Sequence, residues 1–257
     1  MNYYSNIGVI GTGFVGGSVR KWFKGCAHYS LEGGSFDKVD KKEFIFLCLP
    51  TPFDEKVGFK LDALSENIKK LSDGKNIIIK STVLPQTTKT FQSMFPQHNF
   101  FFNPEFLTAD RAWKDFKKPS RQIVGYAKDS IKTKRIAREI LDMLPPSENC
   151  QRICDSSEAE MVKLVSNCHL ALRVVYANQM YDYCEQENVE YNNVIDMVTN
   201  GDKRIEPSHW DIWHKDYRGY SGFCFPKDMG AVIYDSNSEL LRTAHELNDK
   251  YIKDTKK

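Results

Sequence analysis

The chain has 257 residues, with 36 Lys and Arg against 34 Asp and Glu and a formal net charge of +2. This length suits one large domain or two small ones. The scattered basic residues exclude a nucleic-acid-binding stripe and a polybasic membrane segment. No apolar run approaches the ~20 residues of a spanning helix, and the N-terminus lacks a secretion-signal pattern. We therefore expect a cytoplasmic protein without nucleic-acid or membrane partners.

The seven cysteines are odd in number and show no paired CxxC spacing. Disulfides are rare in a reducing compartment, and a single cysteine is by default a small buried side chain. His209 and His214 have no carboxylate or cysteine at a familiar metal-ligand spacing. We therefore predict no metal site and no disulfide framework.

The first elements in chain order are an apolar strand over residues 7–10 and a helix over residues 17–23, joined by a GxGxxG sequence. Gly11 permits the tight turn, Gly13 lets the backbone approach a pyrophosphate, and Gly16 allows close packing of helix on strand. The motif is weak alone, but a preceding strand and a following helix give it the required context. The predicted cofactor contacts here are Gly11, Gly13, Phe14, Val15 and Gly16.

A second strand over residues 27–31 ends at Glu32. An acidic residue at that strand end accepts hydrogen bonds from the adenosine ribose hydroxyls, which favours NAD over NADP. The separation of Glu32 from Gly16 along the sequence is slightly shorter than the usual spacing of about 20 residues. The alternative is that Glu32 is a surface acid in a turn.

Continuous apolar runs over residues 44–49 and 76–80 indicate parallel strands that are buried on both faces. Ligands of open parallel sheets bind at the carboxyl ends of the strands. Further cofactor contacts are therefore predicted at Pro50, Thr51, Pro52, Ser81 and Thr82. Residues 99–102 and 122–125 are predicted to form further strands.

Residues 158–187 contain no proline or glycine and are apolar on more than one face, which predicts a long buried helix. We interpret it as the connection between two domains and as a dimer contact. Lys163 and Asn167 lie four residues apart and share a face. A lysine inside an apolar helix is costly unless it is paired or used. The alternative is a lysine that snorkels to solvent at the rim.

The remainder is predicted to be mainly helical, with interruptions at 200–204 and 208–220. Gly219 and Gly222 give the loop before Cys224 freedom to lie close to a substrate. Pro226 suits the first turn of a helix, so Cys224 is placed just before a helix N-terminus, where the dipole favours a thiolate. Cys224 is either a buried core residue or a nucleophile.

These elements predict an α/β fold. Residues 1–155 are expected to form an NAD-binding domain, which is a Rossmann-like, doubly wound parallel sheet. Residues 156–257 are expected to form the long connecting helix and a small, mainly helical domain for substrate binding and dimerisation.

The chain resembles the UDP-glucose/GDP-mannose dehydrogenase family, and is most similar to its UDP-glucose 6-dehydrogenase branch. The matching segments occur in the family's order: IGVIGTGFVG, LCLPTP, IIIKSTVLPQTT, NPEFL, PSRQIVG, EAEMVKLVSNCHLALRVVYANQM, DKRI and GYSGFCFPKD. NPEFL, E-x-E-x-x-K-x-x-x-N and CFPKD are together specific.

The resemblance implies that two NAD oxidise a sugar-nucleotide CH2OH to a carboxylate, as in UDP-glucuronate formation for polysaccharide biosynthesis. Cys224 would be the nucleophile, and Lys163 and Asn167 would stabilise the oxyanion. Glu105, Asp228 and Thr82 would handle protons or the hydrolytic water. The implied substrate contacts are Glu105, Phe106, Leu107, Lys163, Asn167, Arg204, Tyr217, Tyr220 and Gly222. Arg204 would reach the substrate, across the interface of a homodimer formed through the 158–187 helix.

The sequence also departs from the family. The C-terminal nucleotide-sugar domain has no counterpart, Ala109 replaces a glutamate after NPEFL, and Gln86 replaces a glycine. Three alternatives remain open. One is another substrate, GDP-mannose or a different nucleotide sugar. Another is a simpler β-hydroxyacid dehydrogenase, which has no need of the CFPKD cysteine. The third is a non-catalytic NAD-binding subunit that regulates a partner.

Overall fold

The computed structural model describes residues 3–256, which divide into two compact units. Among the described residues, the first unit comprises 3–52 together with 59–163, and the second comprises 53–58 together with 164–256. The functional domain boundary expected between residues 155 and 156 stays a prediction. No helix in residues 3–256 is long and apolar enough to cross a bilayer.

The first unit is built on a sheet with the strand order β10-β9-β8-β7-β4-β1-β2-β3. Its strands are β1 (Ile7–Ile10), β2 (Ala27–Ser30), β3 (Gly33–Gly34), β4 (Phe44–Leu47), β7 (Asn76–Ile79), β8 (Asn99–Phe102), β9 (Gln122–Tyr126) and β10 (Gln151–Asp155). The series from β2 through β1, β4 and β7 to β8 is parallel, as predicted. β9 runs antiparallel to β8, and β10 runs parallel to β9.

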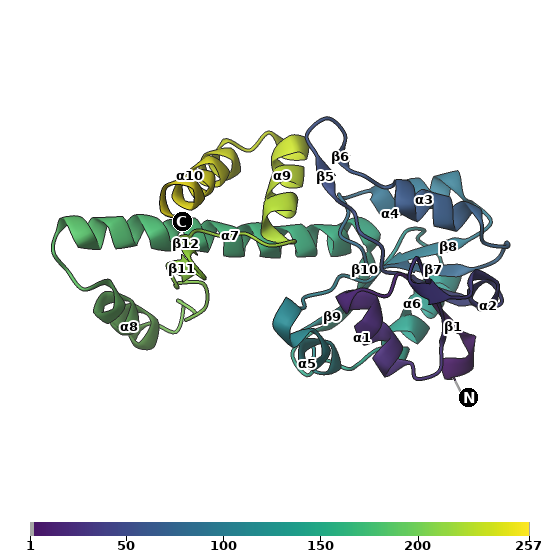
Figure 1. Cartoon of the computed structure of the whole chain (residues 1–257). Helices are drawn as coiled ribbons and strands as arrows, with labels where there is room; N and C mark the ends of the chain where they lie inside the picture. Colours follow the sequence, from purple (N-terminus) through teal and green to yellow (C-terminus); the bar gives the residue numbers. More distant parts are fainter. Residues whose placement is uncertain (1–2, 257) are drawn as a thin grey trace. The chain divides into compact units, whose positions relative to one another are not determined.

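Helices cover both faces of this sheet (Figure 1). Strand side chains such as Val9 and Phe46 pack with α1 (Phe14–Trp22), α5 (Ala112–Lys117) and α6 (Ile131–Met143). The alternate side chains, such as Ile45, pack with α2 (Phe36–Asp40), α3 (Asp62–Lys69), α4 (Thr87–Met94) and the first turn of α7 (Ser156–Gln186). Because successive strand residues point to opposite faces, both surfaces are apolar. The doubly wound prediction is confirmed.

Three strands end earlier in the structure than the sequence predicts. β2 stops at Ser30, and Leu31 is fully exposed in a turn with Glu32. β4 stops at Leu47 and β7 at Ile79. Short 3-10 turns occur at Tyr3–Asn6 and Ala109–Arg111, and β5 (Phe53–Asp54) and β6 (Gly58–Phe59) form a small hairpin.

The second unit is mainly helical, as predicted. Its elements are the rest of α7, α8 (Tyr191–Gly201), the hairpin β11 (Trp213–His214) and β12 (Tyr217–Arg218), α9 (Phe225–Ser236) and α10 (Glu239–Thr255). Buried side chains of α7, α9 and α10, including Ala171, Met229 and Ala244, form a hydrophobic core in this unit. Arg218 ties the hairpin to α7 through Asn178 and Asp182.

The long helix predicted at 158–187 is α7, and Figure 1 shows it as one continuous element. The expectation that it is apolar and buried nearly all round is wrong at several positions. Met161, Val165, Tyr176 and Tyr183 are 47%, 58%, 54% and 58% exposed. One stripe of α7 is therefore apolar and solvent-facing.

Candidate functional site

The glycines after β1 form a turn that is closely packed at Gly11 and Gly16 and open at Gly13. Gly11 has a φ of +89°, and a Cβ there would lie 2.3 Å from the Cys48 carbonyl oxygen. A Cβ on Gly16 would lie 1.9 Å from the Gly11 carbonyl oxygen, so both positions require glycine. Gly13 is the N-cap of α1 and is exposed, and a Cβ there would meet nothing within 4 Å. The open N-terminus of α1 therefore fits the pyrophosphate of a dinucleotide.

Two alanine substitutions in this turn distinguish an effect on NAD binding from a general effect on the fold. We expect Gly13→Ala to weaken NAD binding by roughly tenfold, because one misplaced methyl group costs about 1–3 kcal/mol. Gly17→Ala is the matched control, since its Cβ would make only an ordinary 3.5 Å contact with Thr12. Calorimetric titration with NAD measures the difference. Equal affinities of the two variants would contradict the assignment.

The polar residues after β4 and β7 mainly fasten the two strand ends together. The Ser81 hydroxyl donates to the Leu49 carbonyl oxygen at 2.6 Å and accepts from the Leu49 N–H at 3.1 Å. The Thr51 hydroxyl donates to the Thr82 carbonyl oxygen at 2.6 Å. Thr82 is buried, whereas Pro50 and Pro52 are exposed. Their contacts with a cofactor stay predictions, as does the ribose contact of the exposed Glu32.

Glu105 and Lys163 form a buried ion pair. The Lys163 Nζ lies 2.8 Å from Glu105 Oε1, and the two side chains are 5% and 7% exposed. Glu105 Oε2 accepts a hydrogen bond from the Leu107 N–H at 2.7 Å. Burial alone would raise the pKa of Glu105, but the Lys163 charge and these hydrogen bonds together hold it below its usual value. Lys163 is therefore paired inside the protein and does not snorkel to solvent.

The ion pair predicts how stability responds to acid. A carboxyl whose pKa is depressed by folding contributes stability that is complete above its unfolded pKa and is lost as pH falls through the folded pKa. The unfolded value for glutamate is about 4.3. We expect the difference in unfolding free energy between the wild type and Glu105→Gln to shrink as pH falls below about 4.3. Urea unfolding across this range measures it. A constant difference would contradict an ionised Glu105.

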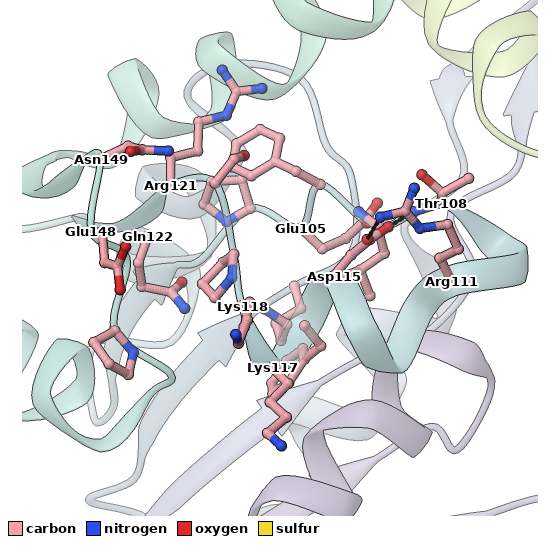
Figure 2. Close-up of a pocket in the computed structure, with 18 residues that line it drawn as sticks. Glu105, Thr108, Arg111, Asp115, Lys117, Lys118, Arg121, Gln122, Glu148 and Asn149 are labelled. Atoms are coloured by element: carbon pink, nitrogen blue, oxygen red, sulfur yellow. Dashed lines mark hydrogen bonds and ion pairs between the residues drawn. The ribbon is translucent and has the colours of Figure 1, made fainter.

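A cavity of about 790 Å³ lies beside this pair, at the carboxyl end of β8. Its wall includes Glu105, Phe106 and Leu107, which were predicted to contact substrate. The Arg121 guanidinium lies 3.7 Å from the centre of the Phe106 ring. In Figure 2, Arg121 points toward the top of the view and Lys117 toward the bottom, so these two side chains do not converge.

Cys224 occupies the position predicted for it in the second unit. It is the N-cap of α9, and Pro226 lies in the first turn of that helix. The Cys224 side chain is partly exposed, and Gly222 has a φ of +86°. By contrast, burial raises the pKa of the Cys168 thiol to about 12, with a further contribution from Asp228. Burial thus disfavours the thiolate form of Cys168.

Asp228 connects the cysteine helix to α7. It is fully buried and lies one turn after Cys224 on α9. Asn167 Nδ2 donates to Asp228 Oδ2 at 2.5 Å, and Lys227 Nζ lies 2.5 Å from Asp228 Oδ1. Within the second unit, the structure thus brings together Asn167 and Asp228, which were predicted from separate motifs.

The other predicted substrate contacts have intramolecular partners. Arg204 is exposed and pairs with Asp202 through two nitrogen atoms. Tyr217 and Tyr220 are 8% and 3% exposed, and their hydroxyls contact Ser221 and His245. Their roles toward a substrate stay predictions.

Sequence reasoning missed two buried charged residues of the first unit, Lys80 and Glu160. Lys80 Nζ donates to Asn103 Oδ1 at 2.6 Å, and burial lowers its pKa to about 8. Glu160 accepts from the Thr88 N–H at the start of α4, and burial raises its pKa to about 7. Both lie in motifs noted above, KSTV and E-x-E, but their partners are distant in sequence. Within residues 3–256 no group of His, Cys, Asp and Glu is arranged to hold a metal.

Two family models cover most of the chain. Residues 23–144 match the UDP-glucose/GDP-mannose dehydrogenase family, NAD binding domain, and residues 157–250 match the central domain of the same family. The matched NAD-binding domain indicates NAD as the cofactor, and the glycine turn at residues 11–16 lies before the matched residues.

Individual proteins agree with this match. UDP-glucose 6-dehydrogenase of Campylobacter jejuni is 32% identical over 214 residues, which are 80% of this chain and 53% of the relative. UDP-N-acetyl-D-mannosamine dehydrogenase of Methanococcus vannielii is 27% identical over 223 residues, covering 83% of this chain and 49% of the relative. The chain thus spans about half the length of these curated relatives.

Among solved structures, a UDP-glucose dehydrogenase from the hyperthermophilic archaeon Pyrobaculum islandicum has a TM-score of 0.80 to this chain at 22% identity. The match covers 95% of this chain and 68% of that chain. At such identity the likeness concerns the fold, and it agrees with the sheet and helix order found here.

Proposed function

Since the chain belongs to the UDP-glucose/GDP-mannose dehydrogenase family, we propose that it is an NAD-dependent nucleotide-sugar dehydrogenase that converts UDP-glucose to UDP-glucuronate. The observation that carries the proposal is the position of Cys224. It caps α9 one turn before a buried carboxylate, Asp228, which is bonded to Asn167 of α7. A nucleophilic thiol and a buried acid–amide pair are what a covalent route from aldehyde to carboxylate needs.

A bound NAD, held at the N-terminus of α1 beside Gly13, would supply the hydride acceptor for each of the two oxidations. Glu105, which is paired with Lys163 and lines the cavity at the end of β8, accepts the hydroxyl proton in this proposal. Thr82 helps to orient the substrate alcohol. In this proposal the alcohol carbon loses two hydrides, and water supplies the second oxygen atom of the product.

Cys224 acts between the two oxidations. Its thiolate adds to the aldehyde carbon, and the resulting oxyanion is stabilised by Lys163 and Asn167. Loss of the second hydride leaves a thioester on Cys224. A water molecule that is deprotonated by Asp228 or Glu105 attacks this thioester, releasing the carboxylate and restoring the thiol. A reducing compartment such as the cytoplasm suits this reaction, because the thiol must stay reduced.

The substrate is tested directly by a coupled NADH assay across a panel of nucleotide sugars. UDP-glucose should give the highest kcat/KM. A higher value with GDP-mannose or with UDP-N-acetyl-D-mannosamine would reassign the substrate within the class. UDP-N-acetyl-D-mannosamine is included in the panel because the Methanococcus vannielii relative is a UDP-N-acetyl-D-mannosamine dehydrogenase. No NADH with any nucleotide sugar would overturn the proposed activity.

The competing function is a non-catalytic subunit that binds NAD and regulates a partner. Calorimetry distinguishes the two, because an enzyme must bind both NAD and a nucleotide sugar. Heat of binding with NAD and none with UDP-glucose or GDP-mannose would favour the regulatory role.

We also propose a homodimer through α7. The exposed apolar side chains Met161, Val165, Tyr176 and Tyr183 lie on this helix, and such surface is normally covered. Light scattering at micromolar concentration should give twice the chain mass of 29.7 kDa. Val165→Glu should shift the population toward monomer, because it places a charge in the interface. A monomeric wild type would contradict the dimer.

A further inference from the structure

One buried side chain of α10 holds the backbone of the cysteine loop. Asn248 Oδ1 accepts a hydrogen bond from the Tyr220 N–H at 2.6 Å, and Asn248 Nδ2 donates to the Tyr220 carbonyl oxygen at 3.0 Å. Asn248 is only 1% exposed. Its amide therefore satisfies both backbone groups of Tyr220, as a neighbouring strand would.

Gly219 is adapted to this contact. Its φ is +97°, which disfavours any side chain, and a Cβ there would lie 2.7 Å from Asn248 Oδ1. The glycine before Tyr220 thus has two independent reasons to lack a side chain. One is the backbone conformation and the other is the close approach of Asn248.

The Tyr220 side chain continues the contact toward Cys224. Its hydroxyl lies 2.8 Å from Nδ1 of His245, which is one turn before Asn248 on α10. The Tyr220 ring packs edge-on against Phe225, with ring centres 5.9 Å apart. Phe225 directly follows Cys224 and opens α9. Tyr220 therefore links α10 to the first residue of the cysteine helix.

The other side of α9 is fixed independently. The hydrogen bond between Asn167 and Asp228 attaches the first turn of α9 to α7. Only Ser221, Gly222 and Phe223 separate the anchored Tyr220 from Cys224. The start of α9 is thus held from α7 on one side and from α10 on the other.

We propose that Asn248 is a positioning residue for Cys224, because its amide fixes the 219–222 loop and thereby holds the thiol at the N-terminus of α9. The catalytic part of this statement rests on the proposed function. The structural part does not, because it concerns the loop alone.

The structural part is tested without substrate. Asn248→Asp keeps the acceptor for the Tyr220 N–H but places a second oxygen against the Tyr220 carbonyl, whereas Asn248→Ala removes both bonds. Hydrogen exchange of the peptide containing Tyr220 should accelerate by about tenfold or more in both variants. Alkylation of Cys224 by iodoacetamide, quantified by peptide mass spectrometry, should accelerate by about threefold or more. The exposed Glu246→Gln on the same helix should leave both rates unchanged, and Cys184 serves as the internal reference thiol.

His245→Phe provides a milder variant that keeps the aromatic packing and loses only the bond to the Tyr220 hydroxyl. It should accelerate both the hydrogen exchange of the Tyr220 peptide and the alkylation of Cys224, but by less than the two Asn248 variants do. Exchange and alkylation rates that equal those of the wild type in the folded Asn248 variants would overturn the proposal. Selective loosening of the Cys224 peptide, with Cys184 unaffected, supports it.

The catalytic part predicts a split between kinetic constants. Asn248→Asp should lower kcat by about 10- to 100-fold, since small misplacements of a reacting group have effects of that size. The KM for NAD should not change, because the glycine turn belongs to the other unit. An unchanged kcat alongside a loosened loop would overturn the catalytic part. If the wild type shows no dehydrogenase activity, the proposed function fails, and the exchange and alkylation rates still decide the role of Asn248 in the loop.

Discussion

Cys224→Ser is expected to abolish formation of UDP-glucuronate, lowering the rate by roughly 10³-fold or more. A serine hydroxyl is a much weaker nucleophile than a thiolate, so the aldehyde is not captured. The first oxidation does not need the thiol, so the variant should form at most one NADH per UDP-glucose. Chromatographic separation of the nucleotide sugars, with NADH absorbance, measures both quantities.

Cys184→Ser is the matched control in the same unit, because Cys184 is also partly buried and lies on α7 away from the start of α9. It should retain the wild-type rate. Full conversion to the carboxylate by Cys224→Ser would remove the cysteine from the mechanism and leave an acid–base dehydrogenase.

Lys163→Met is expected to lower the free energy of unfolding of the first unit by about 3–5 kcal/mol, because it leaves the Glu105 carboxylate buried without its counter-charge. The same variant should lose oxyanion stabilisation and fall by about 10²–10³-fold in kcat. Urea unfolding followed by a probe in the first unit measures the stability.

Two further variants test whether the expected loss of stability in Lys163→Met arises from the burial of the Glu105–Lys163 ion pair. Lys89 and Asp155 form an ion pair at the same distance of 2.8 Å, but with side chains 35% and 34% exposed. Lys89→Met should therefore cost less than about 1 kcal/mol. Glu105→Gln in the Lys163→Met background should recover most of the stability and none of the activity. Equal losses for Lys163→Met and Lys89→Met would contradict a buried, charged pair.

The central part of the sheet could be predicted because its strands are continuous apolar runs with turn residues at their ends. β10 was missed because Gln151–Asp155 is a polar edge strand with exposed residues at its start. β3 was missed because it consists of two glycines. The antiparallel direction of β9 was not predictable either, since a strand's direction depends on the path of the preceding connection and leaves no mark on its own apolar pattern.

The residues of the candidate site could also be predicted only in part. Cys224 at a helix N-terminus followed from local spacing and from Pro226, and Lys163 with Asn167 followed from the period of one helix. The partners of these residues did not. The bonds Asn167–Asp228 and Asn248–Tyr220 join residues that are distant in sequence, and their existence depends on how α7, α9 and α10 pack. One sequence records the side chains but not those pairings.

The ratio of NADH formed to UDP-glucose consumed by the 257-residue chain tests the central claim most directly. A four-electron oxidation through a thioester predicts two NADH for each UDP-glucose, with UDP-glucuronate as the product. A ratio of one with a released aldehyde, or no NADH at all, would contradict the claim.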